Sequence, residues 1–167
     1  MSDAPSVTFH LNGVEVRGDA DASLLQVVRS AGTTSVKDGC SPQGQCGCCT
    51  VWVDGQPRVA CVTPAARVAG RSVTTLEGLP AATDWARRLC DSGGSQCGFC
   101  TPGIIMRLAA IPAAQRSDAT VRQALLAHLC RCTGWNTIVD GALAAPRPFP
   151  GWARAPEPAE ARATLDF

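Results

Sequence analysis

Eight of the ten cysteines in this 167-residue chain fall into two groups of four, and this pattern restricts the fold more than any other feature. The downstream group joins a C-x2-C pair to a later C-x-C pair and comprises Cys97, Cys100, Cys130 and Cys132. The upstream group lies in and after a glycine-rich loop and comprises Cys40, Cys46, Cys49 and Cys61. Four thiolates brought together suit a compact metal centre. The sequence therefore predicts a chain that folds around two metal–sulfur centres.

The start of the sequence bears on the choice between metal ligation and disulfide bonds. Residues 1–5 begin neither a basic nor an apolar signal region, and no apolar run approaches the ~20 residues of a membrane span. We therefore expect a cytoplasmic chain without a membrane span, where thiols stay reduced and bind metals rather than form disulfides. The formal net charge of +1 gives no reason to expect a nucleic-acid partner.

Alternating apolar residues in the first half predict a sheet with one helix. Residues 7–17 form a hairpin around Asn12-Gly13, with Val14 and Val16 continuing its apolar face, and Ser23 begins a helix with a capping box. Further strands are expected over 50–53, 57–62 and 72–76, and the second of these carries Cys61.

Residues 77–82 contain glycine and proline and mark a domain boundary, after which the apolar period changes to that of helices. Four short helices are expected, and together they predict a small bundle. They are a helix over 84–91, one capped by Thr101 with Pro102 first, one capped by Ser117 that carries Leu125 and Leu126, and one over 135–144. The proline-rich tail, 146–167, is expected to be solvent-exposed or to lie as an extended arm on a partner.

The upstream cysteines follow C-x5-C-x2-C-x11-C, which is close to the plant-type ferredoxin pattern but one residue longer in the first gap. Cys48 competes with Cys49 as third ligand; the spacing favours Cys49 and leaves Cys48 as a small packed residue. Zinc is the alternative metal, although zinc knuckles usually consist of two tight cysteine pairs.

The downstream cysteines lie at helix edges. Cys100 precedes a predicted helix start, where free N–H groups favour a thiolate. Arg131 either raises the reduction potential of the centre or is a surface residue. Cys90 has no cysteine near it in sequence and is expected to be a buried small residue.

Residues 96–103 (QCGFCTPG) and 129–135 (LCRCTGW) resemble the iron–sulfur part of the xanthine oxidase, or molybdenum hydroxylase, family. The resemblance implies an α+β chain with a ferredoxin-like β-grasp domain (1–78) and a four-helix domain (82–145), each holding a [2Fe–2S] cluster. It implies that the first four cysteines hold the cluster farther from molybdenum and the second four the nearer one. It also implies that Gln96 and Cys132 lie against the molybdopterin cofactor of a large partner subunit.

The resemblance further implies a role in which electrons pass from molybdenum through both clusters to FAD on a medium subunit, or to a cytochrome or quinone. The chain departs from the family in its longer first loop, in Cys48 where alanine is usual, in Trp135 where tyrosine is usual, and in His128. Two other interpretations remain: a freestanding ferredoxin-like electron carrier, and a zinc-organised interaction module without a redox role.

Overall fold

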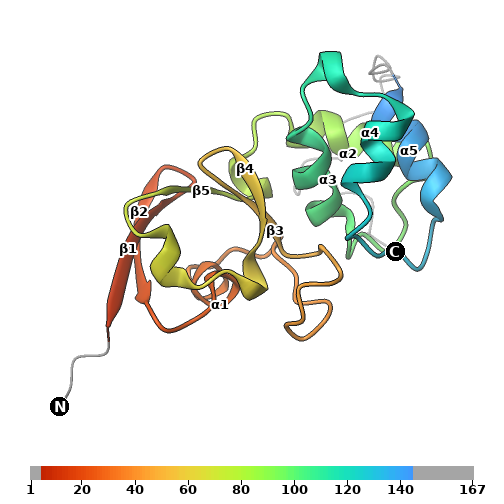
Figure 1. Ribbon diagram of the computed structural model, residues 1–167. Helices are drawn as coiled ribbons and strands as arrows, with labels where there is room; N and C mark the ends of the chain where they lie inside the picture. Colours follow the sequence, from red (N-terminus) through yellow and green to blue (C-terminus); the bar gives the residue numbers. More distant parts are fainter. Residues whose placement is uncertain (1–4, 145–167) are drawn as a thin grey trace, which may run out of the picture.

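The computed structural model describes residues 5–144, in which a five-stranded sheet with one helix is followed by four further helices (Figure 1). The predicted tail lies outside the described residues. The strands are β1 (Ser6–Leu11), β2 (Val14–Asp19), β3 (Thr50–Val53), β4 (Gln56–Val59) and β5 (Ser72–Thr74). The helices are α1 (Leu24–Ser30), α2 (Ala82–Asp91), α3 (Thr101–Ala109), α4 (Asp118–Ala124) and α5 (Trp135–Leu143).

The hairpin of β1 and β2 forms as the sequence predicts. Asn12 and Gly13 have φ values of 51° and 86°, the left-handed pair that a two-residue hairpin turn requires. The prediction that Val14 and Val16 continue the apolar face is wrong for Val14, whose side chain is 67% exposed, whereas Val16 is partly buried against the core. Val14 begins β2, which is an edge strand, and nothing from the core covers it there.

The sheet has the order β2-β1-β5-β3-β4, with β1 and β5 parallel and the other pairs antiparallel. Helix α1 begins at Ser23, whose side chain and that of Gln26 form the expected capping box. Four apolar residues of α1 share one buried cluster with the strands: Leu24, Leu25, Val27 and Val28. This cluster is the core of the first half of the chain.

Strand β4 ends at Val59, three residues earlier than the sequence predicts, and Cys61 lies in a 3-10 turn over Ala60–Val62. The Ala60 N–H donates to the Cys49 carbonyl, at 3.2 Å, at the point where the strand ends. The turn replaces the end of the predicted strand and brings Cys61 beside Cys49.

The second half consists of α2, α3, α4 and α5. Ser117 caps α4 with Thr120, as expected. Thr101 does not cap α3: Cys100 occupies the cap position, and the Thr101 hydroxyl is 2.8 Å from the Ser95 hydroxyl. Helix α4 ends at Ala124, so Leu126 is 75% exposed rather than part of a buried helix face.

The two halves meet where the segment between α1 and β3, orange in Figure 1, extends toward the helices. The Trp52 indole N–H donates to the Met106 carbonyl at 2.7 Å, and the Leu129 N–H donates to the Cys46 carbonyl at 3.1 Å. A side chain at Gly103 would overlap the Gly47 carbonyl and lie 2.9 Å from the Cys48 Cα. The first cysteine loop is therefore seated directly on the first turn of α3. No helix in residues 5–144 has the length and apolar character needed to cross a bilayer.

Candidate metal centres

The loop that carries the first cysteines is turned by backbone amides and one carboxylate. Ser41 has φ 55°, and its N–H donates to the Asp38 carboxylate at 3.0 Å. The Cys40 sulfur accepts the Gln43 N–H at 3.3 Å. The N–H of Gln45 is the largest of several amide contributions that lower the pKa of Cys40 to about 6, against the opposing effect of burial. The loop with the extra residue thus directs its amides at a sulfur, as an anionic centre requires.

The first cysteine set forms two pairs of neighbouring thiols. Cys40 interacts with Cys46, and Cys49 interacts with Cys61. The Cys61 N–H donates to the Cys49 sulfur at 3.4 Å. Burial raises the pKa of Cys49, which is 1% exposed and belongs to the core of the sheet half.

The second set also forms two pairs, and each pair joins one cysteine of the C-x2-C motif to one cysteine of the C-x-C motif. The Cys97 and Cys132 sulfurs are 3.5 Å apart, and Cys100 interacts with Cys130. The Cys130 sulfur is 3.1 Å from the Thr133 hydroxyl. Burial raises the pKa of Cys100 to about 12, so burial outweighs the lowering expected at a helix start. A bound metal would have to displace that proton.

The arrangement of the cysteine sulfurs in pairs indicates which kind of metal group they could bind. Within residues 5–144, no three His, Cys, Asp or Glu side chains converge closely enough to hold one metal ion. Two sulfurs bound to one tetrahedral metal at about 2.3 Å lie roughly 3.8 Å apart, and the 3.5 Å between Cys97 and Cys132 is close to that separation. A [2Fe–2S] group needs two thiolates on each of two irons, which is the arrangement of two pairs. The paired thiols of each set therefore match the donors that a [2Fe–2S] group requires.

A cavity of about 210 Å³ contains the second set. Its lining residues are Gly39, Cys46, Cys48, Cys97, Phe99, Cys100, Leu129, Cys130, Arg131 and Cys132. Cys46 and Cys48 come from the first loop, yet they line the cavity of the second set. This placement results from the docking of the two halves. In the sequence, only the neighbouring pair Cys48 and Cys49 hints that the first loop supplies an additional cysteine.

The remaining expected site residues lie at the surface. Gln96 is exposed next to Cys97, and its contact with a pterin stays a prediction. Arg131 is also exposed, at the rim of the cavity. The expectation that Cys90 is buried is wrong, because α2 turns Trp85 and Leu89 inward and leaves Cys90 outside.

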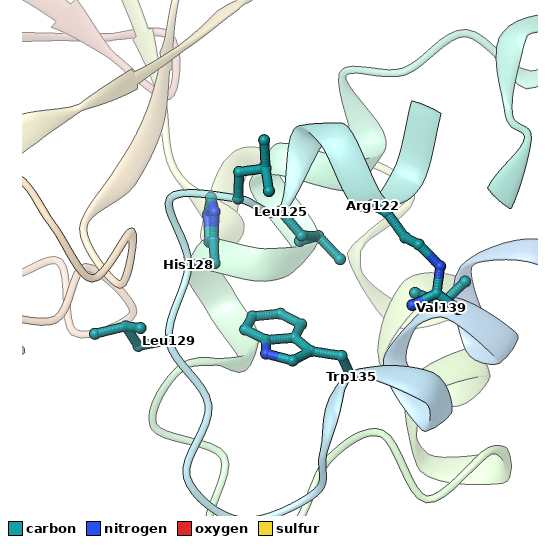
Figure 2. A pocket seen from close by; sticks show the side chains of 7 residues that line it. Arg122, Leu125, His128, Leu129, Trp135 and Val139 are labelled. Atoms are coloured by element: carbon teal, nitrogen blue, oxygen red, sulfur yellow. The ribbon is translucent and has the colours of Figure 1, made fainter. Parts of the chain in front are cut away.

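Two departures from the family pattern line a second hollow, of about 330 Å³, between α4 and α5 (Figure 2). In Figure 2 the Trp135 ring points into the hollow on the side of His128, and Arg122 lies at the opposite edge of the hollow. His128 is buried against Gly47, and burial, assisted by Arg107, lowers the pKa of its imidazole to about 4. Its Nδ1 atom has no hydrogen-bond partner among the described residues. His128 therefore acts first as a packing residue between the halves.

Comparison with known proteins agrees with this arrangement. Residues 4–78 match the "2Fe-2S iron-sulfur cluster binding domain" family, and residues 75–143 match the "[2Fe-2S] binding domain" family. The xanthine dehydrogenase iron-sulfur-binding subunit of Escherichia coli O157:H7 is 36% identical over 154 residues, which cover 86% of this chain and 96% of that subunit. The xanthine dehydrogenase of Emericella nidulans is 39% identical over 157 residues, 82% of this chain but only 11% of that protein.

Solved structures give the same result. Quinoline 2-oxidoreductase from Pseudomonas putida 86 superposes with a TM-score of 0.75 at 33% identity, covering 83% of this chain and 90% of that one. The two family matches define an iron–sulfur protein with two [2Fe–2S]-binding domains and an electron-transfer role. The chain belongs to the iron–sulfur subunits of the xanthine dehydrogenase, or molybdenum hydroxylase, family. It thus functions as part of an oxidoreductase complex.

Proposed function

We propose that this chain carries single electrons from a molybdopterin centre on a large subunit, through two [2Fe–2S] groups, to FAD on a medium subunit. In this proposal residues 1–78 and 82–145 are the two cluster domains, and the two family matches support that division. Cys40, Cys46, Cys49 and Cys61 hold one group. Cys97, Cys100, Cys130 and Cys132 hold the other.

The observation that carries the proposal is that two sets of paired thiols share one wall, formed by the first cysteine loop where it is seated on α3. A [2Fe–2S] group accepts and releases one electron at a time. The chain's own residues supply the remaining requirements. Backbone amides of the loop and the turn donate to the sulfurs, and buried side chains keep water from the first set.

The openness of the second set supports its assignment as the one nearer molybdenum. Cys97 and Cys132 are exposed, Gln96 is exposed beside them, and the Phe99 side chain is 46% exposed. In the proposal, the large subunit covers this face, and Gln96 and Cys132 contact its pterin.

Iron and sulfide analysis of the anaerobically isolated chain tests the proposal most directly. We expect about four irons and four labile sulfides per chain and, after reduction with dithionite, two signals in electron paramagnetic resonance (EPR), because each set holds one two-iron group. Cys97→Ser should remove one signal and leave the other. Cys90→Ser is the matched control, since Cys90 is an exposed cysteine outside both sets, and it should keep both signals. A colourless chain loaded with zinc would refute the proposal.

Gln96 is tested in the assembled complex. Gln96→Ala should retain both EPR signals but slow the reduction of the clusters by substrate, if its amide contacts the pterin. Unchanged reduction kinetics would remove Gln96 from that contact while leaving the cluster assignment intact.

A further inference from the structure

Cys48 is the one buried cysteine outside the two assigned sets in residues 5–144, and it lies between them. Its neighbour Cys49 belongs to the core of the sheet half, whereas Cys48 belongs to the core of the helical half. Two consecutive residues thus face two different centres. This division occurs where the chain passes from the first loop into β3.

Distances around Gly39 and Gly103 place Cys48 between the first loop and the start of α3. A Cβ built on Gly39 would be 2.9 Å from the Cys46 sulfur and 3.2 Å from the Cys48 sulfur, so the two sulfurs share one small space. On the other side, the Cys48 backbone lies against Gly103, three residues after Cys100. The Cys48 side chain lines the same cavity as Cys46 of the first set and Cys100 of the second, so assigned ligands of both sets lie around it.

The surroundings of Cys48 indicate a packed wall rather than a ninth ligand. Its S–H is oriented toward the Cys46 carbonyl, at 3.6 Å, so its proton already has an acceptor. It is 4% exposed, and it lines the cavity of the second set from the side of the first. A glycine is required at position 39 because any side chain there would displace the Cys46 and Cys48 sulfurs.

We propose that the Cys48 side chain is a positioning residue that links the two centres electronically, by filling the space between Cys46 and Cys100 with a polarisable sulfur. The inference rests on the proposed two-cluster function. In the transfer that it assists, one electron leaves one centre and enters the other, and no bond forms or breaks. Alanine, which is usual at this position in the family, would leave a gap there. The atoms that line such a void lose their contacts across it, so the electron would have to cross empty space instead of packed atoms.

The test uses the full chain isolated with both clusters, as wild type, Cys48→Ala and Cys48→Ser. In Cys48→Ala we expect four irons and both EPR signals to remain, while one-electron transfer between the clusters, followed by pulse radiolysis, slows by roughly tenfold. The magnetic splitting between the two fully reduced clusters should also shrink. Cys48→Ser replaces most of the lost volume and should recover part of the rate. Its stronger O–H dipole should raise the reduction potential of at least one cluster. Cys90→Ala should change none of these quantities.

Two results would overturn the inference. One is an unchanged transfer rate and an unchanged splitting in Cys48→Ala with both clusters present, which would leave Cys48 as packing alone. The other is the loss of one EPR signal in both Cys48 variants, which would make Cys48 a ligand. A wild-type chain without iron would instead refute the proposed function, so the two failures are distinguishable.

Discussion

The two cysteine sets use the same donor chemistry but differ in their access to solvent. Three cysteines of the first set are buried in the chain's own core, and the sulfurs of Cys40 and Cys49 each accept a backbone N–H from the same half. The second set has one exposed pair, Cys97 and Cys132, beside a partly exposed Phe99. The residues of this chain therefore enclose most of the first set, whereas the second set has one face open to solvent.

The largest effect should come from serine replacements that compare the two sets. Cys61→Ser should remove the first cluster and lower the free energy of unfolding by about 3–5 kcal/mol, because Cys61 lies in the buried core of the sheet. Cys132→Ser should remove the second cluster with a smaller loss, since Cys132 is exposed. EPR identifies the lost cluster, and denaturant unfolding measures the stability. Equal destabilisation by the two variants would contradict the comparison.

The Gly47→Ala variant tests whether the first cysteine loop packs tightly against His128, at the contact between the two halves. Gly47 has φ +67°, and a Cβ there would lie 2.6 Å from the Nε2 atom of His128. We expect a loss of about 3 kcal/mol, which combines backbone strain with steric overlap. Gly70→Ala is the control, because Gly70 has the same φ of +67° but nothing within 4 Å of its Cβ position, and it should cost only about 1 kcal/mol. If the two variants were equally stable by denaturant unfolding, the loop would not be held against His128.

A pH titration of stability tests the burial of His128 at that same contact. Its pKa is lowered from 6.5 to about 4 in the folded chain, chiefly by burial, so below pH 6.5 the unfolded chain binds a proton that the folded chain does not. Stability should therefore fall as the pH drops from 6.5 toward 4, by about 2 kcal/mol at pH 5. His128→Gln removes this group, and its stability should fall less over the same range. The same slope in both proteins would show that His128 titrates normally.

The smallest effects should come from the helix caps, one in each half. Ser23→Ala and Ser117→Ala should each lower stability by about 1 kcal/mol, because each removes a capping hydrogen bond at a helix start. Both clusters should keep their EPR signals in both variants. Thermal unfolding measures the loss, and a loss of either signal would mean that the cap supports a centre directly.

Local patterns predicted most of the elements. The Asn12-Gly13 turn, the Ser23 and Ser117 caps and the change from strands to helices after residue 77 all depend on neighbouring residues, and the structure contains them. The early end of β4 and the exposure of Leu126 were not predicted, because each depends on where a chain segment leaves the core. Cys61 pairs with Cys49 from a 3-10 turn rather than from a strand.

The spacing of the cysteines placed Cys97, Cys100, Cys130 and Cys132 in one set but not in pairs; the structure has Cys97 beside Cys132 and Cys100 beside Cys130, and their role as ligands stays a prediction. It could not show that Cys46 and Cys48 line the cavity of that set, because this results from the docking of two halves distant in sequence. It likewise could not show that His128 and Trp135, two departures from the family pattern, border one hollow.

Helix α3 is held against the first half at two places: Gly103 at its start packs on the first cysteine loop, and its Met106 carbonyl accepts the Trp52 indole N–H of β3. The covalent link between the halves, residues 79–81, is therefore not what keeps them together. A proteolytic nick in that link should yield two fragments that elute as one species, with the iron of both centres still bound.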